Sequence, residues 1–177
     1  MRTNKLVKIS LLSTIAAVLG CFGLPIFEAW LKLDLGDLPA VIAAFAFGPV
    51  SGIVVELIKN LLIFVLKNSG TFGIGESANF LVGVMMVIPA GLIYQKHKSR
   101  KSAIIGLSVG VVSMVIGGAI LNYLVLFPLY GSVLHFTLPK SLVFTAIVPF
   151  NLLKGAIIAV LSIVLYKRIS PILHKNI

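Results

Sequence analysis

The stretch from Leu38 to Leu66 reads LPAVIAAFAFGPVSGIVVELIKNLLIFVL, and its length and its interruption decide the fold. It holds 29 mostly apolar residues, whereas about 20 residues are enough for a helix to cross the hydrocarbon core of a bilayer. Gly48-Pro49 lies inside it, and a helix usually ends before a proline because proline lacks an N–H and clashes with the preceding turn. The stretch is therefore either one long kinked helix or two shorter helices that meet at Gly48-Pro49.

Positive charges on either side of this stretch decide between the two arrangements. The N-terminal segment 2–8 and the segment 96–101 (KHKSRK) are both basic, which is typical of cytoplasmic segments in membrane proteins. An even number of crossings must separate two cytoplasmic segments. The apolar stretches 6–24 and 80–94 supply two crossings, so the stretch between them must supply two more. The sequence therefore predicts a break at Gly48-Pro49.

The composition places the whole chain in a membrane. Of the 177 residues, 59% are hydrophobic and 11% are charged, against about 45–50% and 25% in soluble domains. Further apolar stretches at 103–127 and 142–166 bring the number of predicted helices to six, the second of them short (roughly 38–48). We predict an all-α integral membrane protein with one domain, 1–177, and with both termini cytoplasmic. Ten of the 15 Lys and Arg residues then lie on the cytoplasmic side, the last being Lys175, and three lie outside.

Several function classes are excluded or disfavoured. The net charge of +10 does not indicate nucleic-acid binding, because the charges lie mainly in loops that set orientation. The single Cys21 excludes an intramolecular disulfide and a multi-cysteine metal site, and the three histidines lie far apart, so neither a metal centre nor an enzyme is expected. There is no phosphate-binding loop motif, so ATP used in transport must be hydrolysed on another chain.

Ionisable and amide side chains recur inside the predicted helices, where such groups are costly and usually mark a function. On the third helix, spacings of three and four place Glu56, Lys59 and Asn60 on one face. Similar groups on the other helices are Asn79, Asn122-Tyr123, Asn151 and Lys154. The predicted topology brings them all between the midplane and the outer third of the membrane, which indicates a small-molecule pocket that opens outward. The alternative is a structural cluster in which Glu56 neutralises Lys59 or Lys154 and the asparagines join helices.

Two other features bear on this pocket and on partners. The segment 25–37 carries Glu28, Asp34 and Asp37, and we expect it to fold back over the outer face, although an ordinary polar loop is the alternative. Small residues recur every four positions at Ser13, Ala17 and Cys21 on the first helix. Such spacing lets helices approach closely, and here it predicts contact with an external partner.

The sequence resembles a known family in several short segments. Residues 33–39 (LDLGDLP) and 46–49 (AFGP) resemble the substrate-binding subunits, or S components, of energy-coupling factor (ECF) transporters. The segments that resemble the riboflavin-specific branch are 56–60 (ELIKN), 75–80 (GESANF), 122–123 (NY) and 149–155 (PFNLLKG). The resemblance covers nearly the whole chain.

This resemblance implies a monomeric six-helix subunit of the plasma membrane that captures riboflavin from outside and requires no cofactor. It implies docking on a transmembrane coupling subunit that carries two ATPase subunits, through small residues of the first helix, which here correspond to Ser13, Ala17 and Cys21. The family motif usually has alanines, so Ser13 and Cys21 depart from it. The predicted substrate-binding residues are Asp34, Leu35, Glu56, Asn60, Asn79, Asn122, Tyr123, Asn151 and Lys154.

The chemistry of riboflavin agrees with these residue types. An asparagine amide can accept from the imide N–H of the flavin ring and donate to a neighbouring carbonyl, and Lys154 can donate to a carbonyl oxygen. Two alternatives stay open at this point. One is an S component for another vitamin or for flavin mononucleotide (FMN), and the other is a stand-alone secondary transporter in which Glu56 carries a proton.

Overall fold

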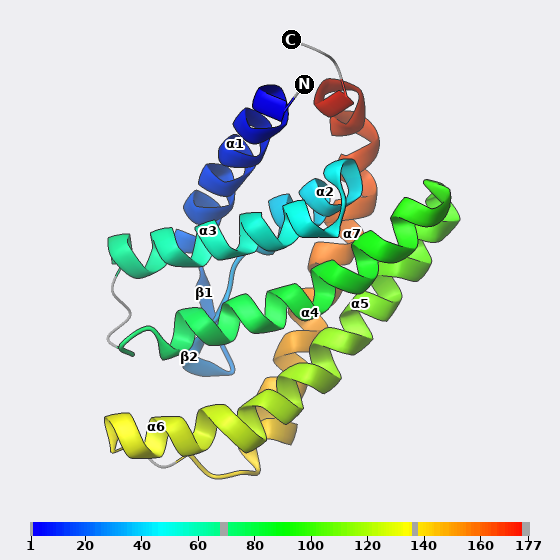
Figure 1. Ribbon diagram of the computed structural model, residues 1–177. Coiled ribbons are helices and arrows are strands. Elements are labelled where there is room, and N and C mark those ends of the chain that lie inside the picture. The colour runs from blue at the N-terminus through cyan, green and yellow to red at the C-terminus, as the bar shows by residue number, and fades with distance from the viewer. Residues whose placement is uncertain (1, 68–70, 136–137, 175–177) are drawn as a thin grey trace.

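The computed structural model describes residues 2–67, 71–135 and 138–174, and nearly all of them are helical (Figure 1). Lys175, predicted to be cytoplasmic, lies outside the described residues. The α-helices are α1 (Arg2–Cys21), α2 (Asp37–Phe47), α3 (Pro49–Lys67), α4 (Ile74–His97), α5 (Arg100–Leu121), α6 (Phe127–Leu134) and α7 (Val148–His174). Two π-helical segments, η1 (Asn122–Leu126) and η2 (Val143–Ile147), and two strands, β1 (Leu24–Ile26) and β2 (Glu28–Leu33), complete the fold.

The predicted break at Gly48-Pro49 is confirmed. Helix α2 ends at Phe47, and Gly48 adopts a φ of 97°, where a residue without a Cβ is favoured. The Gly48 N–H donates to the Ala44 carbonyl at 3.0 Å and so caps α2. Pro49 then begins α3, a position where its missing N–H costs nothing. The 11 residues of α2 extend over only about 16 Å, and every residue from Asp37 to Phe45 is buried among the other helices.

The segment between α1 and α2 folds back, but as a β-hairpin, which corrects the all-α prediction locally. Helix α1 ends at Cys21, three residues before the predicted end at Leu24. Leu24 precedes Pro25, and a residue before proline avoids the helical conformation. Strands β1 and β2 pair antiparallel, with Leu24 opposite Leu33. The hairpin brings the start of α2 back toward the centre of the helices.

The fifth predicted helix is longer than expected, because it continues beyond Phe127. Helix α5 passes without interruption through η1 into α6 and ends at Leu134. In a π-helical turn an extra residue is accommodated in the helix, and such turns are frequent at functional sites. The η1 turn begins at Asn122, one of the predicted binding residues.

Within the described part of the chain, five helical segments are long and apolar enough to cross a membrane by length and composition: Thr3–Cys21, Pro49–Lys67, Ile74–His97, Arg100–Val133 and Val143–Tyr166. The shorter apolar helix Asp37–Phe47 is the sixth apolar helix. In Figure 1 the start of α1 and the end of α7 lie at the same end of the molecule, and the β-hairpin and α6 lie toward the opposite end. At the end away from the hairpin, Phe45 of α2 stacks on Tyr94 and meets Tyr166 edge-on.

Two of the three small residues of α1 lie on its buried side, and their role in docking stays a prediction. Ser13 and Ala17 are only 1% and 3% exposed. They belong to the buried side of α1, together with Ile9, Leu12 and Ala16. The four-residue spacing therefore serves close packing of α1 inside the chain, in particular against α3. Of the three predicted docking residues, only Cys21 is partly exposed.

Candidate functional site

A short turn between β2 and α2 places two carboxylates at the centre of the molecule. Asp34 Oδ1 accepts a hydrogen bond from the Gly36 N–H at 2.8 Å, an Asx turn that leads directly into α2. A Cβ on Gly36 would lie 2.8 Å from the Ala16 carbonyl oxygen, so the turn needs glycine here. Asp37 occupies the first turn of α2, where the helix dipole favours a negative charge.

Two buried lysines neutralise these carboxylates. Lys59 of α3 contacts Asp37 Oδ1, and its Nζ lies 2.6 Å from Glu56 Oε2. Lys154 of α7 lies 3.1 Å from Asp34 Oδ2 and 3.0 Å from Asp37 Oδ2. All five side chains are at most 7% exposed. Buried charges are costly inside a membrane, and here each of them has a partner of opposite charge. Glu56 is thus the partner of Lys59, and Lys154 is paired with the two aspartates instead.

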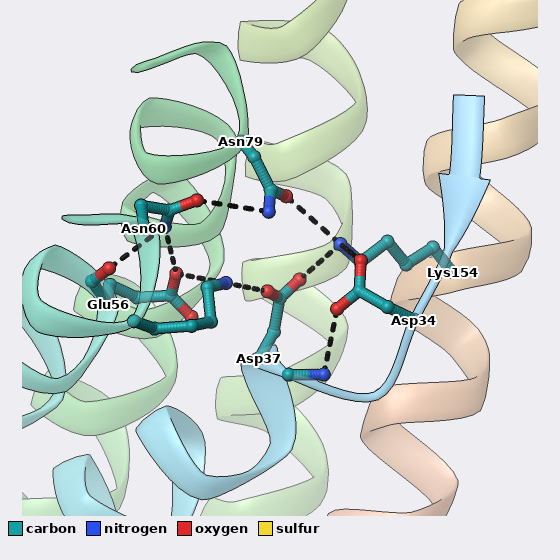
Figure 2. Close-up of polar contacts among 8 residues, drawn as sticks. Asp34, Asp37, Glu56, Asn60, Asn79 and Lys154 are labelled. Carbon is teal, nitrogen blue, oxygen red and sulfur yellow. Dashed lines mark hydrogen bonds and ion pairs between the residues drawn. The ribbon is translucent and has the colours of Figure 1, made fainter. Parts of the chain in front are cut away.

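A chain of amides connects the same groups across α4 (Figure 2). Lys154 Nζ donates to Asn79 Oδ1 at 3.1 Å, and Asn79 Nδ2 donates to Asn60 Oδ1 at 3.2 Å. Asn60 Nδ2 in turn donates to the Glu56 carbonyl at 2.8 Å and to Glu56 Oε2 at 3.3 Å. Since an ammonium group can only donate and a carboxylate can only accept, the amides have one consistent orientation.

A cavity of about 400 Å³ lies beside this polar cluster, within the range of small-molecule sites. The hairpin segment contributes Leu31, Lys32 and Asp34 to its wall, and helices α3, α4, α5 and α7 contribute most of the rest. Six of the nine predicted binding residues line it: Asp34, Asn60, Asn79, Asn122, Asn151 and Lys154. The structure therefore brings together residues that are up to 120 positions apart in the chain.

Three predicted binding residues are not among those that line the cavity. Leu35 packs against the main hydrophobic core. Glu56 is completely buried behind Asn60. Tyr123 is 39% exposed and its ring lies 4.5 Å from the Lys140 ammonium group.

Sequence reasoning also missed residues of this site. Asp37 and Lys59 were not among the predicted binding residues, although both belong to the central cluster. Glu76 and Tyr130 line the cavity as well. Gly83 of α4 leaves room for the Glu56 carboxylate, because a Cβ there would lie 2.7 Å from Glu56 Oε2. The spacing of Glu56 and Lys59, three apart on one helix, was the available signal for their pairing.

Asn151 is the most informative of the lining residues. Its side chain is 4% exposed and lines the cavity, and it makes no hydrogen bond to any of the described residues. Space for its amide is provided by Gly118, since a Cβ there would lie 2.5 Å from Asn151 Nδ2. The Asn151 amide is therefore open to the cavity and free to donate to and accept from a polar ligand there. Among the described residues, no group of three or more His, Cys, Asp or Glu side chains is placed to hold a metal ion.

Comparison with known proteins agrees with the fold. The family described as "ECF transporter, substrate-specific component" matches residues 4–166. The chain belongs to this family. Curated relatives of this substrate-specific component match it over nearly their whole length. The riboflavin transporter RibU of Staphylococcus aureus (strain TCH60) is 40% identical, and the alignment covers 99% of this chain and 95% of the relative. The riboflavin transporter FmnP of Bacillus subtilis (strain 168) is 35% identical over 99% of this chain and 97% of its own length.

A solved structure is similar to this ECF substrate-specific component throughout. It is described as the S component of a bacterial ECF transporter, and it superimposes with a TM-score of 0.84 at 40% identity. The alignment covers 99% of this chain and all of the solved chain. Together with its apolar helices, this likeness makes the chain a multi-pass membrane protein.

Proposed function

We propose that this ECF substrate-specific component binds riboflavin in the central cavity and delivers it for import across the bacterial plasma membrane. The observation that carries the proposal is the buried Asn151 amide, which faces the cavity without a hydrogen-bond partner among the described residues. An amide that accepts from an imide N–H and donates to the neighbouring carbonyl suits the polar edge of a flavin ring. The printed names of the S. aureus and B. subtilis relatives support the same ligand.

The paired charges around Lys154 favour a neutral group beside them, while Lys32, Lys67 and Glu76 line other parts of the cavity. The carboxylates of Asp34 and Asp37 and the Lys154 ammonium group already balance one another in part. A neutral ring system can therefore bind beside them without bringing another charge into a buried environment, which would be costly. Asn60, Asn79, Asn122 and Lys154 offer further donors and acceptors along the same wall.

We place both chain ends and the basic segment 96–101 on the cytoplasmic side, and the hairpin on the outer side, with α2 too short to span the membrane alone. In this orientation the cavity receives its ligand from outside. Transport is powered by separate subunits: a transmembrane coupling subunit and two ATPases, on which ATP is hydrolysed. This chain would then be the binding subunit and not an enzyme.

The test is a binding titration with the purified protein. Riboflavin fluorescence should be quenched on binding, and the purified protein should carry the visible absorption of a flavin. Asn151→Leu should weaken binding strongly because it leaves the donor and acceptor of the ligand unpaired. FMN and unrelated vitamins, added as competitors, define the ligand. A wild-type protein that is folded but does not quench riboflavin would refute the proposal.

A stand-alone proton-coupled transporter is the second candidate, and one observation favours it. Oε1 of the buried Glu56 carboxylate makes no hydrogen bond within the described residues, so this group is a natural place for a proton. That mechanism requires uptake that stops when the proton gradient is collapsed. The ECF mechanism requires uptake that stops when the ATPase subunits are deleted, and uptake assays in such cells separate the two.

A further inference from the structure

Six side chains around the cavity wall form a closed ring of polar contacts (Figure 2). In order around the ring, they are Lys154, Asp37, Lys59, Glu56, Asn60 and Asn79. The hydrogen bond between Asn79 and Lys154 closes the ring. The ring joins α2, α3, α4 and α7. Its members Lys154, Asn60 and Asn79 line the cavity, whereas Asp37, Lys59 and Glu56 lie behind them and are at most 1% exposed.

The two carboxylates of the ring use their oxygens differently. Asp37 gives each lysine its own oxygen, with Oδ1 toward Lys59 and Oδ2 at 3.0 Å from Lys154 Nζ. Glu56 uses one oxygen, Oε2, for both Lys59 and Asn60. Asp37 Oδ2 and Glu56 Oε1 both make no hydrogen bond among the described residues, but Asp37 Oδ2 has the ion pair with Lys154. The ring therefore needs both oxygens of Asp37 but only one of Glu56.

Asp37 is one of two carboxylates that hold the Lys154 ammonium group: Lys154 Nζ donates to Asp34 Oδ2 at 3.1 Å and forms an ion pair with Asp37 Oδ2 at 3.0 Å. Lysine ends in a mobile point charge on a four-carbon stem, so its position depends on the acceptors around it. Of the two carboxylates that pair with it, Asp34 lies in the turn between β2 and α2, whereas Asp37 lies in α2 itself and is 1% exposed. The helix gives Asp37 a fixed place, and its second oxygen is held by Lys59.

We propose that Asp37 is a positioning residue of the binding site: it fixes the Lys154 ammonium group at the cavity wall and acts on the ligand only through Lys154. This inference rests on the proposed function, because its readout is riboflavin affinity. Glu56 has no such role, although it is equally buried.

Two isosteric substitutions test the difference, because each replaces one buried carboxyl group by an amide of the same shape. In Asp37→Asn the amide must turn its NH₂ group toward one of the two lysines, so a donor faces a donor. In Glu56→Gln the carbonyl oxygen replaces Oε2 and the NH₂ group takes the place of the unpartnered Oε1. Riboflavin titrations should show a loss of about tenfold or more for Asp37→Asn, the order expected when a charged contact is lost. Glu56→Gln should lose at most about threefold.

A double-mutant cycle shows whether Asp37 acts through Lys154. In a Lys154→Met background, Asp37→Asn should weaken binding by no more than about twofold further, because the group it positions is gone. In an Asn122→Leu background the full loss should persist, since among the described residues the Asn122 amide bonds only to the Gly118 carbonyl one turn earlier. A purely structural role of Asp37 would instead lower affinity equally in all backgrounds.

A rescue variant covers the case in which Asp37→Asn alone does not fold. Adding Lys59→Met to Asp37→Asn removes the clash of donors and leaves the carbonyl oxygen of the new amide free to accept from Lys154. Affinity should then return to within about threefold of wild type. Three results would each overturn the inference while wild-type binding stands. The first is an equal loss of affinity in Asp37→Asn and Glu56→Gln, and the second is an additive loss when Asp37→Asn is combined with Lys154→Met. The third is a folded rescue variant that binds riboflavin no better than Lys154→Met. Absence of wild-type binding would instead refute the proposed function.

Discussion

Replacing Gly118 by alanine should weaken riboflavin binding without destabilising the protein. A Cβ at this position would lie 2.5 Å from Asn151 Nδ2, whereas ordinary contacts begin at 3.4 Å. The other near atoms, Val82 Cγ2 and Asn151 Cγ, are at 3.5 and 3.6 Å and need not move. The Asn151 amide must therefore withdraw by about 1 Å, because a packed interior leaves no room to absorb the methyl group.

The size of the effect follows from the bonds that Asn151 would lose. An amide that both accepts from and donates to the ligand makes two hydrogen bonds, each with a net contribution of about 0.5–1.5 kcal/mol. Their loss amounts to about 1–3 kcal/mol, or roughly a five- to 150-fold weaker affinity. Alanine in place of glycine inside α5 favours the helix by up to about 1 kcal/mol, so thermal stability should hold or rise.

The assay is a fluorescence titration of riboflavin against purified Gly118→Ala, with thermal unfolding measured in parallel. Gly117→Ala is the matched control: it is the adjacent glycine, and its added Cβ would meet the Met85 side chain, which does not line the cavity. The control should bind as tightly as wild type. Equal affinities for the two variants would mean that Asn151 does not contact the ligand, and would remove the main ground for the proposed function.

Three further predictions concern topology, α1 and the charge cluster. In whole cells, a cysteine introduced at position 72 should be labelled by an impermeant reagent and one at position 98 should not; the reverse pattern would contradict the proposed orientation. Ala17→Leu should lower the thermal stability of the isolated protein by about 1–3 kcal/mol, because Ala17 is buried; an unchanged melting temperature would mean that this face of α1 is open. Lys154→Met should destabilise the ligand-free protein by about 3–5 kcal/mol, since it leaves buried carboxylates without their partner. Adding Asp34→Asn should restore much of that loss, and a further decrease in unfolding temperature would show that Asp34 and Lys154 are not a pair.

The sequence by itself determined the features that depend on local chemistry and on composition. A helix usually ends before a proline, and a glycine before it can adopt the positive φ that the connection needs, so the break at Gly48-Pro49 could be predicted. The excess of apolar residues identified a membrane protein, and the cost of polar groups in a bilayer singled out asparagines and one lysine, Lys154, that do line the cavity.

Only the tertiary structure decided which of these groups meet and which face each helix turns inward. Lys154 pairs with Asp34 and Asp37 and not with Glu56, because the hairpin returns the start of α2 to α7, a contact between residues 120 positions apart. Ser13 and Ala17 have the spacing of an exposed contact face, yet α1 is rotated so that they pack inside. Periodicity shows that residues share a face of a helix, but the direction of that face depends on the packing of all its neighbours.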